Sequence, residues 1–179
     1  MPHISTGVEY GLHCLLFLVD PPPGTKGASV RDLANLQGVP VEYLAKLFTK
    51  LAKADLVVAT EGIRGGFSLA RPAGKITVQD VVEAIDGDKA LFDCREIRSR
   101  CALFEDAPPA WATRGVCSIH AVMQAAEKAM RQELSKHTLA DLAERTLAKA
   151  NASFGPHVVQ WLTDRATHRR GDRDTDARD

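Results

Sequence analysis

The first half of the chain is divided into stretches in which apolar residues recur at regular intervals. In four stretches the interval is three or four residues, which predicts amphipathic helices over about residues 5–19, 30–37, 40–53 and 77–87. Two shorter runs, 56–60 and 67–70, predict strands, and the glycine-containing segment between them predicts a hairpin. Three helices, a hairpin and a further helix, in this order, predict a winged helix-turn-helix domain over residues 1–87.

The ends of the second and third helices carry the signals of a helix-turn-helix. Ser29 is a residue type that caps helix N-termini, and Gly38 is a type that ends helices. Pro40 follows closely and begins the third helix, so the turn between the two helices is short. Thr77 is the candidate N-cap of the fourth helix.

The periodicity stops after residue 87 and returns at residue 118. Segment 88–117 contains three of the four cysteines and two adjacent prolines, so we expect a long cysteine-containing loop with about one helical turn. Segment 118–166 resumes the helical pattern with an apolar stripe that needs a partner, which predicts a dimerisation helix and a C-terminal helical segment. The alternating charges of residues 167–179 predict a disordered tail. The expected fold is mainly α with a small β-hairpin wing.

The composition limits the class of protein and its location. The 179 residues are 45% hydrophobic, enough for a core, and no apolar run approaches the roughly 20 residues of a membrane span. The N-terminus lacks the pattern of a signal peptide, so we expect a cytoplasmic protein with no membrane contact. Thiols stay reduced there, which favours ligands, redox thiols or core residues over disulfides. The net charge is zero, so any affinity for DNA has to come from local clusters of Lys and Arg.

The third helix is the candidate recognition helix, and its apolar spacing turns Tyr43, Leu44, Leu47, Phe48 and Leu51 inward. Side chains near its N-terminus would contact base edges, and its lysines would contact phosphates. Glu42 is able to accept from cytosine N4, Lys46 and Lys50 offset its charge, and Arg64 at the wing tip suits the minor groove or phosphate. The alternative is that the lysines form an ordinary solvated face. The predicted DNA-binding residues are Ser29, Pro40, Val41, Glu42, Tyr43, Lys46, Lys50, Arg64 and Gly65.

Five short motifs in a fixed order resemble one family of bacterial regulators. They are VPVEYLAKLFTKL at 39–51, ADLV at 54–57, RGGFSLARP at 64–72, ITVQDVVEAIDG at 76–87 and TLADL at 138–142. With the cysteine loop they span about residues 5–147, and they resemble the iron-sulfur cluster regulators, whose members include IscR, NsrR and the cluster-free CymR. The resemblance implies a homodimer in which the helix after the loop crosses its twin. Both winged domains would then read a palindromic operator in double-stranded DNA.

The resemblance also implies a cofactor. Family members with three loop cysteines commonly hold a [2Fe-2S] or [4Fe-4S] cluster that senses redox state, nitric oxide or iron supply. Carried over to this chain, the cysteine ligands are Cys94, Cys101 and Cys117, although the fifteen residues between the last two exceed the usual family spacing. We favour [2Fe-2S], a cluster in which histidine is able to replace cysteine. Zinc accepts the same donors.

The fourth ligand is open between two positions. His120 follows Cys117 by three residues at the start of a helix, so one turn is able to present both to one metal. Glu9 and His13 are four residues apart on the first helix, and some members of the resembling family recruit first-helix residues from the other subunit. The alternative for His13 is an ordinary hydrogen-bonded histidine. Cys14 points about 100° away from His13 around the helix, and we expect it in the core.

These patterns favour one function and keep an alternative. The expected protein is a dimeric DNA-binding transcriptional regulator that senses redox state, nitric oxide or iron through an iron-sulfur cluster. The alternative is a cluster-free winged-helix regulator controlled by a partner protein or by thiol oxidation. An enzyme is disfavoured because the sequence contains no Gly-rich phosphate loop, nucleophile elbow or paired metal motif.

Overall fold

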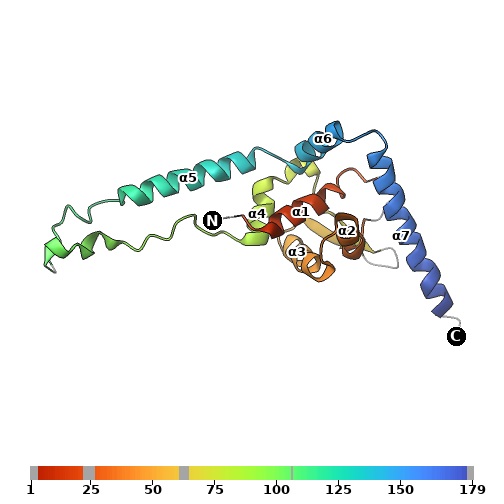
Figure 1. The fold of residues 1–179 in the computed structure, drawn as a ribbon, viewed down its shortest axis with the longest axis horizontal. Coiled ribbons are helices and arrows are strands. Elements are labelled where there is room, and N and C mark those ends of the chain that lie inside the picture. The colour runs from red at the N-terminus through yellow and green to blue at the C-terminus, as the bar shows by residue number, and fades with distance from the viewer. Residues whose placement is uncertain (1–3, 22–26, 61–64, 106, 177–179) are drawn as a thin grey trace. The chain divides into compact units, whose positions relative to one another are not determined.

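The computed structural model describes residues 4–21, 27–60, 65–105 and 107–176, with side chains as far as residue 167 (Figure 1). Its α-helices are α1 (Thr6–Leu16), α2 (Val30–Gln37), α3 (Val41–Lys53), α4 (Val78–Asp86), α5 (Ser118–Ser135), α6 (Leu139–Lys149) and α7 (Phe154–Asp176). The strands are β1 (Val57–Thr60) and β2 (Gly66–Leu69), and the 3-10 helices are η1 (Ala73–Lys75), η2 (Ile97–Arg100) and η3 (Ala102–Phe104). The chain divides into two compact units, residues 1–87 with 135–179 and residues 88–134.

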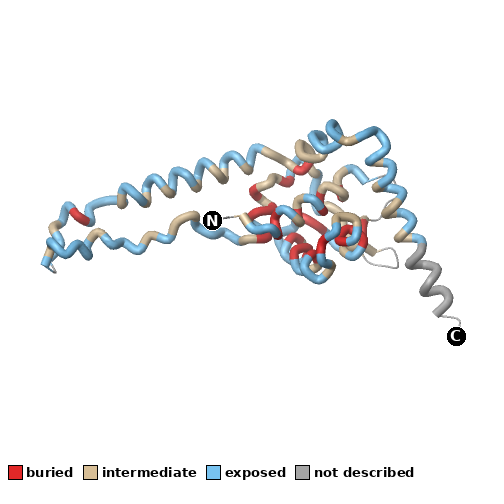
Figure 2. The backbone as a smooth tube through the Cα atoms, in the orientation of Figure 1, coloured by how far each residue is buried: buried red, intermediate tan, exposed pale blue. Residues whose placement is uncertain are grey.

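The core of the first unit lies where the apolar faces of α1, α3 and α4 meet, and Figure 2 shows the buried backbone concentrated there. Its largest fully buried side chains are Phe48, Leu15, Leu33, Leu44, Leu51, Leu56, Ile76, Leu139, Val8, Val81 and Cys14. Burying one such aliphatic or aromatic side chain contributes about 1.5–3 kcal/mol. The periodicity of the sequence predicted most of these positions, and the expected mainly α fold with a hairpin is confirmed.

The expected helix ends are also confirmed. The Ser29 hydroxyl caps α2 by accepting from the Asp32 backbone N–H at 3.1 Å. Gly38 ends that helix with a φ of 71°, a left-handed conformation that favours glycine. Thr77 and Asp80 form a capping box at the start of α4. These caps satisfy backbone N–H groups that would otherwise lack partners, so they fix where the helix-turn-helix begins and turns.

The hairpin is antiparallel, with Val57 opposite Leu69 and Thr60 opposite Gly66. Ala28 adds a third segment beside it, because the N–H of each of Ala28 and Phe67 donates to the other's carbonyl, at 3.1 and 2.8 Å. A side chain at Gly66 would place its Cβ 2.7 Å from the Ala28 carbonyl carbon, so glycine is required for this close approach. The wing is therefore joined to the segment that leads into α2.

Helix α6 joins the first unit at the start of α4. The Val78 N–H donates to the His137 carbonyl at 2.8 Å, and the Leu139 N–H donates to the Ile76 carbonyl at 2.9 Å. A second capping box, made by Thr138 and Asp141, begins α6. The helical pattern expected from residue 118 to about 150 is therefore divided in two.

Helix α7 differs from the sequence-based expectation. We expected a disordered tail over residues 167–179, but the backbone is helical as far as Asp176. The Arg165 guanidinium pairs with the buried Asp32 carboxylate at 3.3 Å and stacks over the Trp161 ring, with 4.7 Å between Cζ and the ring centroid.

No helix in the described part of the chain is long and apolar enough to cross a membrane.

The second unit consists of the cysteine loop and α5. The loop contains η2 and η3, two short helical turns where the sequence predicted about one. Helix α5 has no buried residue, and Ile119 and Val122 are 63% and 66% exposed. The loop is tied to α5 at its beginning, because the Leu91 N–H donates to Glu127 at 3.0 Å and Arg131 pairs with both Glu127 and Asp88. These contacts lower the pKa of Glu127, and the hydrogen bond from the Leu91 N–H has a larger effect than the one from Arg131.

Candidate DNA-binding surface and cysteine loop

The first turn of α3 has the exposure that base contacts require. Glu42 is exposed and Val41 is half-buried, and both follow directly on Pro40. The periodicity placed Tyr43 on the inward face, but its side chain is 40% exposed and packs edge-on against Tyr10, with ring centroids 5.9 Å apart. Tyr43 therefore belongs to the surface at this end of the helix, where a side chain is able to reach a base.

Two lysines of α3 differ in their surroundings. Lys46 is exposed on the helix. Lys50 donates from Nζ to the Ile85 carbonyl at 2.6 Å, in the last turn of α4. A cation at a helix C-terminus is favoured by the helix dipole, so Lys50 helps to hold α4 against α3. Of the two, Lys46 is the better placed for a phosphate.

The other predicted DNA-binding residues lie around this surface. The Ser29 hydroxyl caps α2 and also donates to Asp32 Oδ2 at 2.7 Å. A DNA phosphate at this position would therefore be bound by the N-terminus of α2 and not by the Ser29 hydroxyl alone. Gly65 directly precedes β2 and is half-buried. Arg64 lies outside the described residues.

A cleft runs between α1 and α6. Its volume is about 510 Å³, and Glu9 and His13 line it together with Leu12, Leu16 and Leu142. The two polar side chains are exposed and one helical turn apart, as the sequence predicted. Cys14, the next residue, is fully buried, and burial raises the pKa of its thiol to about 12. The expectation that Cys14 is a core residue is confirmed.

The loop cysteines differ in exposure. Cys94 and Cys117 are half-buried, whereas Cys101 is exposed between η2 and η3. His120 is half-buried in the first turn of α5, with its ring edge-on to Phe92 at 6.1 Å between centroids. Among the described residues, no three His, Cys, Asp or Glu side chains meet in an arrangement that would hold a metal ion.

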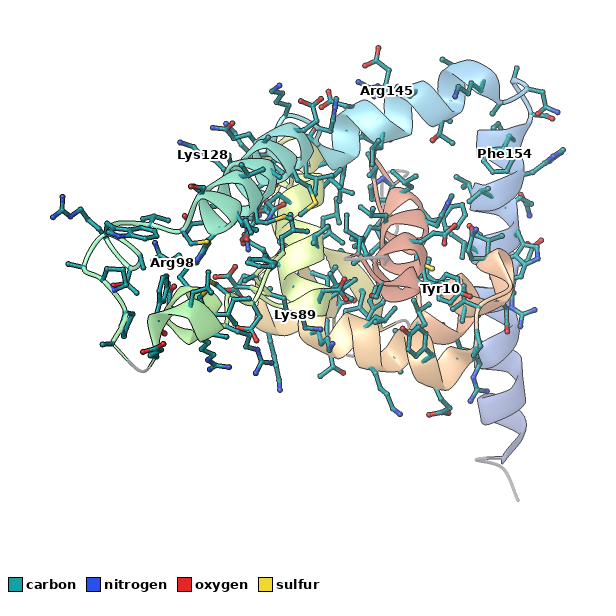
Figure 3. The ribbon with its side chains drawn as sticks, turned by 60° about the vertical axis from the view of Figure 1, so that its left-hand side comes forward. Tyr10, Lys89, Arg98, Lys128, Arg145 and Phe154 are labelled. Atoms are coloured by element: carbon teal, nitrogen blue, oxygen red, sulfur yellow. The ribbon has the colours of Figure 1, made fainter. Side chains whose placement is uncertain are left out.

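One arginine connects the two sides of this loop. Arg98, labelled in Figure 3, pairs with Glu96 at 2.6 Å and donates to the Gly115 carbonyl at 3.0 Å. The hydrogen bond to Glu96 is the main cause that raises the pKa of Arg98, and Cys117 and Cys94 contribute to it. The pKa of Glu96 is lowered, mainly by its hydrogen bond to Arg98. Arg98 could not be recognised from the sequence, since its partners lie up to 17 positions away.

Chemically, the loop offers soft donors. Thiolate sulfur and imidazole nitrogen are the ligands that iron-sulfur clusters and zinc accept, so the residue types fit either group. The three cysteines are not gathered around one point in the described structure, so a complete site would require the segment that carries Cys101 to move or a second chain to contribute. On the first unit, Glu9 offers a carboxylate oxygen and His13 an imidazole nitrogen.

The fold and the first unit together define a helix-turn-helix transcriptional regulator with a wing. The chain belongs to the Rrf2 family, described as iron-dependent transcriptional regulators, which matches residues 4–145. It is a transcriptional regulator of that family and not an enzyme.

Named relatives and solved structures agree with this assignment. The chain is 35% identical to protein Rrf2 of Nitratidesulfovibrio vulgaris over 158 residues, covering 87% of this chain and 98% of the relative. It is 31% identical over 170 residues to the helix-turn-helix regulator Rv1287 of Mycobacterium tuberculosis, covering 94% and 99%. Among structures, T. potens IscR matches with a TM-score of 0.60 and 26% identity, covering 82% of this chain and 90% of that one. CymR, the global cysteine regulator of B. subtilis, shares the fold at 0.62 and 23% identity, covering 81% and 98%.

Proposed function

We propose that this Rrf2-family regulator binds a palindromic operator in double-stranded DNA as a homodimer, and that an iron-sulfur cluster in its cysteine loop controls that binding. The observation that carries the proposal is the presence of Cys94, Cys101 and Cys117 in one loop, with His120 directly after it, in a family described as iron-dependent. Redox state, nitric oxide and iron supply are the signals to which such a cluster responds.

The DNA side of the proposal rests on α3. Its first turn is exposed, and its lysines follow on the same helix, which is the arrangement of a recognition helix in the major groove. The candidate contacts remain Ser29, Pro40, Val41, Glu42, Tyr43, Lys46, Lys50, Arg64 and Gly65. Lys46 is the phosphate contact that we favour, because Lys50 already donates to α4.

The homodimer is supported by α5. An apolar stripe of Ile119, Val122 and Met130 runs along a helix that has no buried residue, and burying such a stripe against a second copy would remove it from water. A dimer would also match the two-fold symmetry of a palindromic operator.

The cluster would be held by Cys94, Cys101 and Cys117. Its fourth ligand would be His120 at the start of α5, or Glu9 or His13 of a second chain, which line the cleft between α1 and α6. Mixed sulfur and nitrogen ligation favours [2Fe-2S]. When bound, the cluster would supply a one-electron redox centre, while the protein residues set the conformation of the loop around it.

The test is the visible absorption spectrum, with iron and acid-labile sulfide, of protein purified without oxygen. We expect charge-transfer bands with matching iron and sulfide contents, and their loss in Cys101→Ala. Comparing His13→Ala with His120→Ala identifies the remaining ligand. Cys14→Ala is the matched control, since its buried thiol is unsuited to ligation.

A colourless, iron-free protein that still binds its operator would refute the cluster. It would favour the second candidate, a cluster-free regulator controlled by thiol oxidation or a partner protein. The exposure of Cys101 is the observation that supports this candidate, because an accessible thiol is open to oxidants. A zinc assay would then follow.

A further inference from the structure

Arg98 bridges two parts of the cysteine loop that are distant in sequence. Its guanidinium donates to the carbonyl oxygens of Thr113, Arg114 and Gly115, at 3.4, 3.5 and 3.0 Å. On the other side it holds Glu96 with two hydrogen bonds, at 2.6 and 2.8 Å. The planar fork of an arginine suits such multiple contacts, whereas a lysine ammonium does not.

The backbone on both sides is shaped for this contact. Glu96 has a φ of 45°, a left-handed conformation that is unusual for a residue other than glycine, and Gly115 has a φ of 68°. Strain of this kind persists only where surrounding contacts fix it. The Arg98 side chain is only 24% exposed, so its hydrogen bonds are partly protected from water. The contacts of Arg98 therefore hold the loop closed at this point.

The contacts of Arg98 bring together two backbone segments, each of which lies next to a cysteine. Cys94 lies two residues before Glu96, and Cys117 lies two residues after Gly115. Cys101 instead belongs to the residues enclosed between Arg98 and Thr113, where it is exposed.

We propose that Arg98 is a positioning residue that clamps the cysteine loop and makes Cys94 and Cys117 a spatial pair that does not include Cys101. The proposal deepens the function proposed above, because the pair would form the fixed half of the ligand set. The pairing itself does not depend on any metal. It is therefore testable in protein from which iron has been removed.

Without the clamp, loop length alone would favour a different cysteine pair. Cys101 follows Cys94 by seven positions, and Cys117 follows it by 23. The entropy of closing a flexible loop rises with its length, so an unclamped chain would favour the Cys94–Cys101 pair over the Cys94–Cys117 pair by about sixfold. The clamp reverses this order.

The experiment is disulfide mapping of the full chain after chelation of metal and brief treatment with diamide. Two thiols lose two protons and two electrons to form the disulfide, and diamide is reduced to the hydrazine. We expect peptide mass spectrometry to find mainly Cys94–Cys117 in the wild-type protein. In Arg98→Gln the ratio should move to Cys94–Cys101, a change of about sixfold or more if the loop becomes flexible. Arg98→Lys should shift in the same direction, because one ammonium does not replace the fork.

Arg95→Gln is the matched control, since Arg95 is 79% exposed and pairs only locally with Asp93 in the described structure. It should keep the wild-type pattern, and circular dichroism should show the same helix content for all variants. Mainly Cys94–Cys101 in the wild-type protein, or an unchanged pattern in Arg98→Gln, would overturn the clamp. A colourless protein with the expected pattern would refute the cluster and leave the clamp standing.

Discussion

Chemically similar residues of this chain have different roles because of their tertiary partners. Lys46 and Lys50 lie one turn apart on α3 and carry the same charge. Only Lys50 reaches the Ile85 carbonyl, at 2.6 Å, so it acts on stability as well as on any DNA contact. In the same way, Cys14 is buried whereas Cys101 is exposed. Residue type alone does not separate these pairs.

Cys14 gives a prediction about alkaline stability. Burial raises the pKa of its thiol from 9.0 to about 12, so between these values the folded protein keeps a proton that the unfolded chain loses. This contribution to stability is complete below 9.0 and is lost as the pH rises toward about 12. At about pH 10 the free energy of unfolding should be lower by about 1 kcal/mol than at pH 8 on this account.

The measurement is urea unfolding of the wild-type protein and Cys14→Ala at both pH values. The variant should be less stable overall, because of the lost packing, but its stability should depend less on pH. An equal pH dependence in the two proteins would contradict the assignment to Cys14.

Among the elements, α3 is exposed on one face, and the capped helix α2 and the turn before α3 fix its direction. The Ser29 cap, the left-handed Gly38 and the bend at Pro40 orient α3 relative to α2. The Ala28–Phe67 bridge then fixes the wing beside the entry to α2. These local devices are the reason that a short surface is able to present several DNA contacts at once.

The recognition helix leads to a prediction about DNA. Lys46→Ala should weaken binding to operator and to nonspecific DNA alike and reduce the slope of log K against log salt by about 1, the effect of one lost phosphate contact. Glu42→Ala should instead relax base preference. Titrations by fluorescence anisotropy at several salt concentrations, with operator and scrambled duplexes, separate the two effects.

Lys50→Ala is the informative comparison, because it should lower the melting temperature more than Lys46→Ala does. An unchanged base preference in Glu42→Ala would mean that the first turn of α3 does not read the operator.

The capping box of α6 gives a second prediction at this scale. Thr138→Ala removes the hydroxyl that accepts from the Asp141 N–H at 3.2 Å, and should cost about 1 kcal/mol of unfolding free energy. The Asp141 carboxylate accepts from the Thr138 N–H, and this hydrogen bond lowers the pKa of Asp141. The stability that the ionised carboxylate contributes is therefore lost as the pH falls through that lowered pKa. Thermal melts of wild type and variant at neutral pH measure the effect, and equal melting temperatures would contradict it.

At the level of the whole molecule, α5 is the element for which we propose a partner in a second copy of the chain. Ile119→Glu with Val122→Glu places charges on the exposed apolar stripe, and we expect sedimentation velocity to show monomers where the wild-type chain is a dimer. Affinity for a palindromic operator should fall, while binding to a half-site changes little. Lys128→Glu, on the same helix, is the control for added charge. A variant that remains dimeric would exclude this stripe as the interface.

The sequence predicted the first unit well because its signals are local. Helical periodicity, the Ser29 and Thr77 caps and the glycine-containing hairpin act within a few residues, so α2, α4 and the wing were predicted nearly to their ends. The Tyr43 side chain was misplaced because its exposure depends on Tyr10, far away in the chain. The contact of α7 with Asp32 through Arg165 was likewise not predicted, because the two residues lie far apart in the chain.

The class of protein, the order of its elements and the residue types available for DNA and for a metal could all be inferred from the amino-acid sequence. These follow from periodicity, capping and donor chemistry, which the residues carry wherever the chain goes. The contacts of Lys50 with α4, of Asp32 with Arg165 and of Arg98 across the cysteine loop could be seen only in the folded chain. Each of these contacts joins residues many positions apart, and their approach depends on how the whole chain packs.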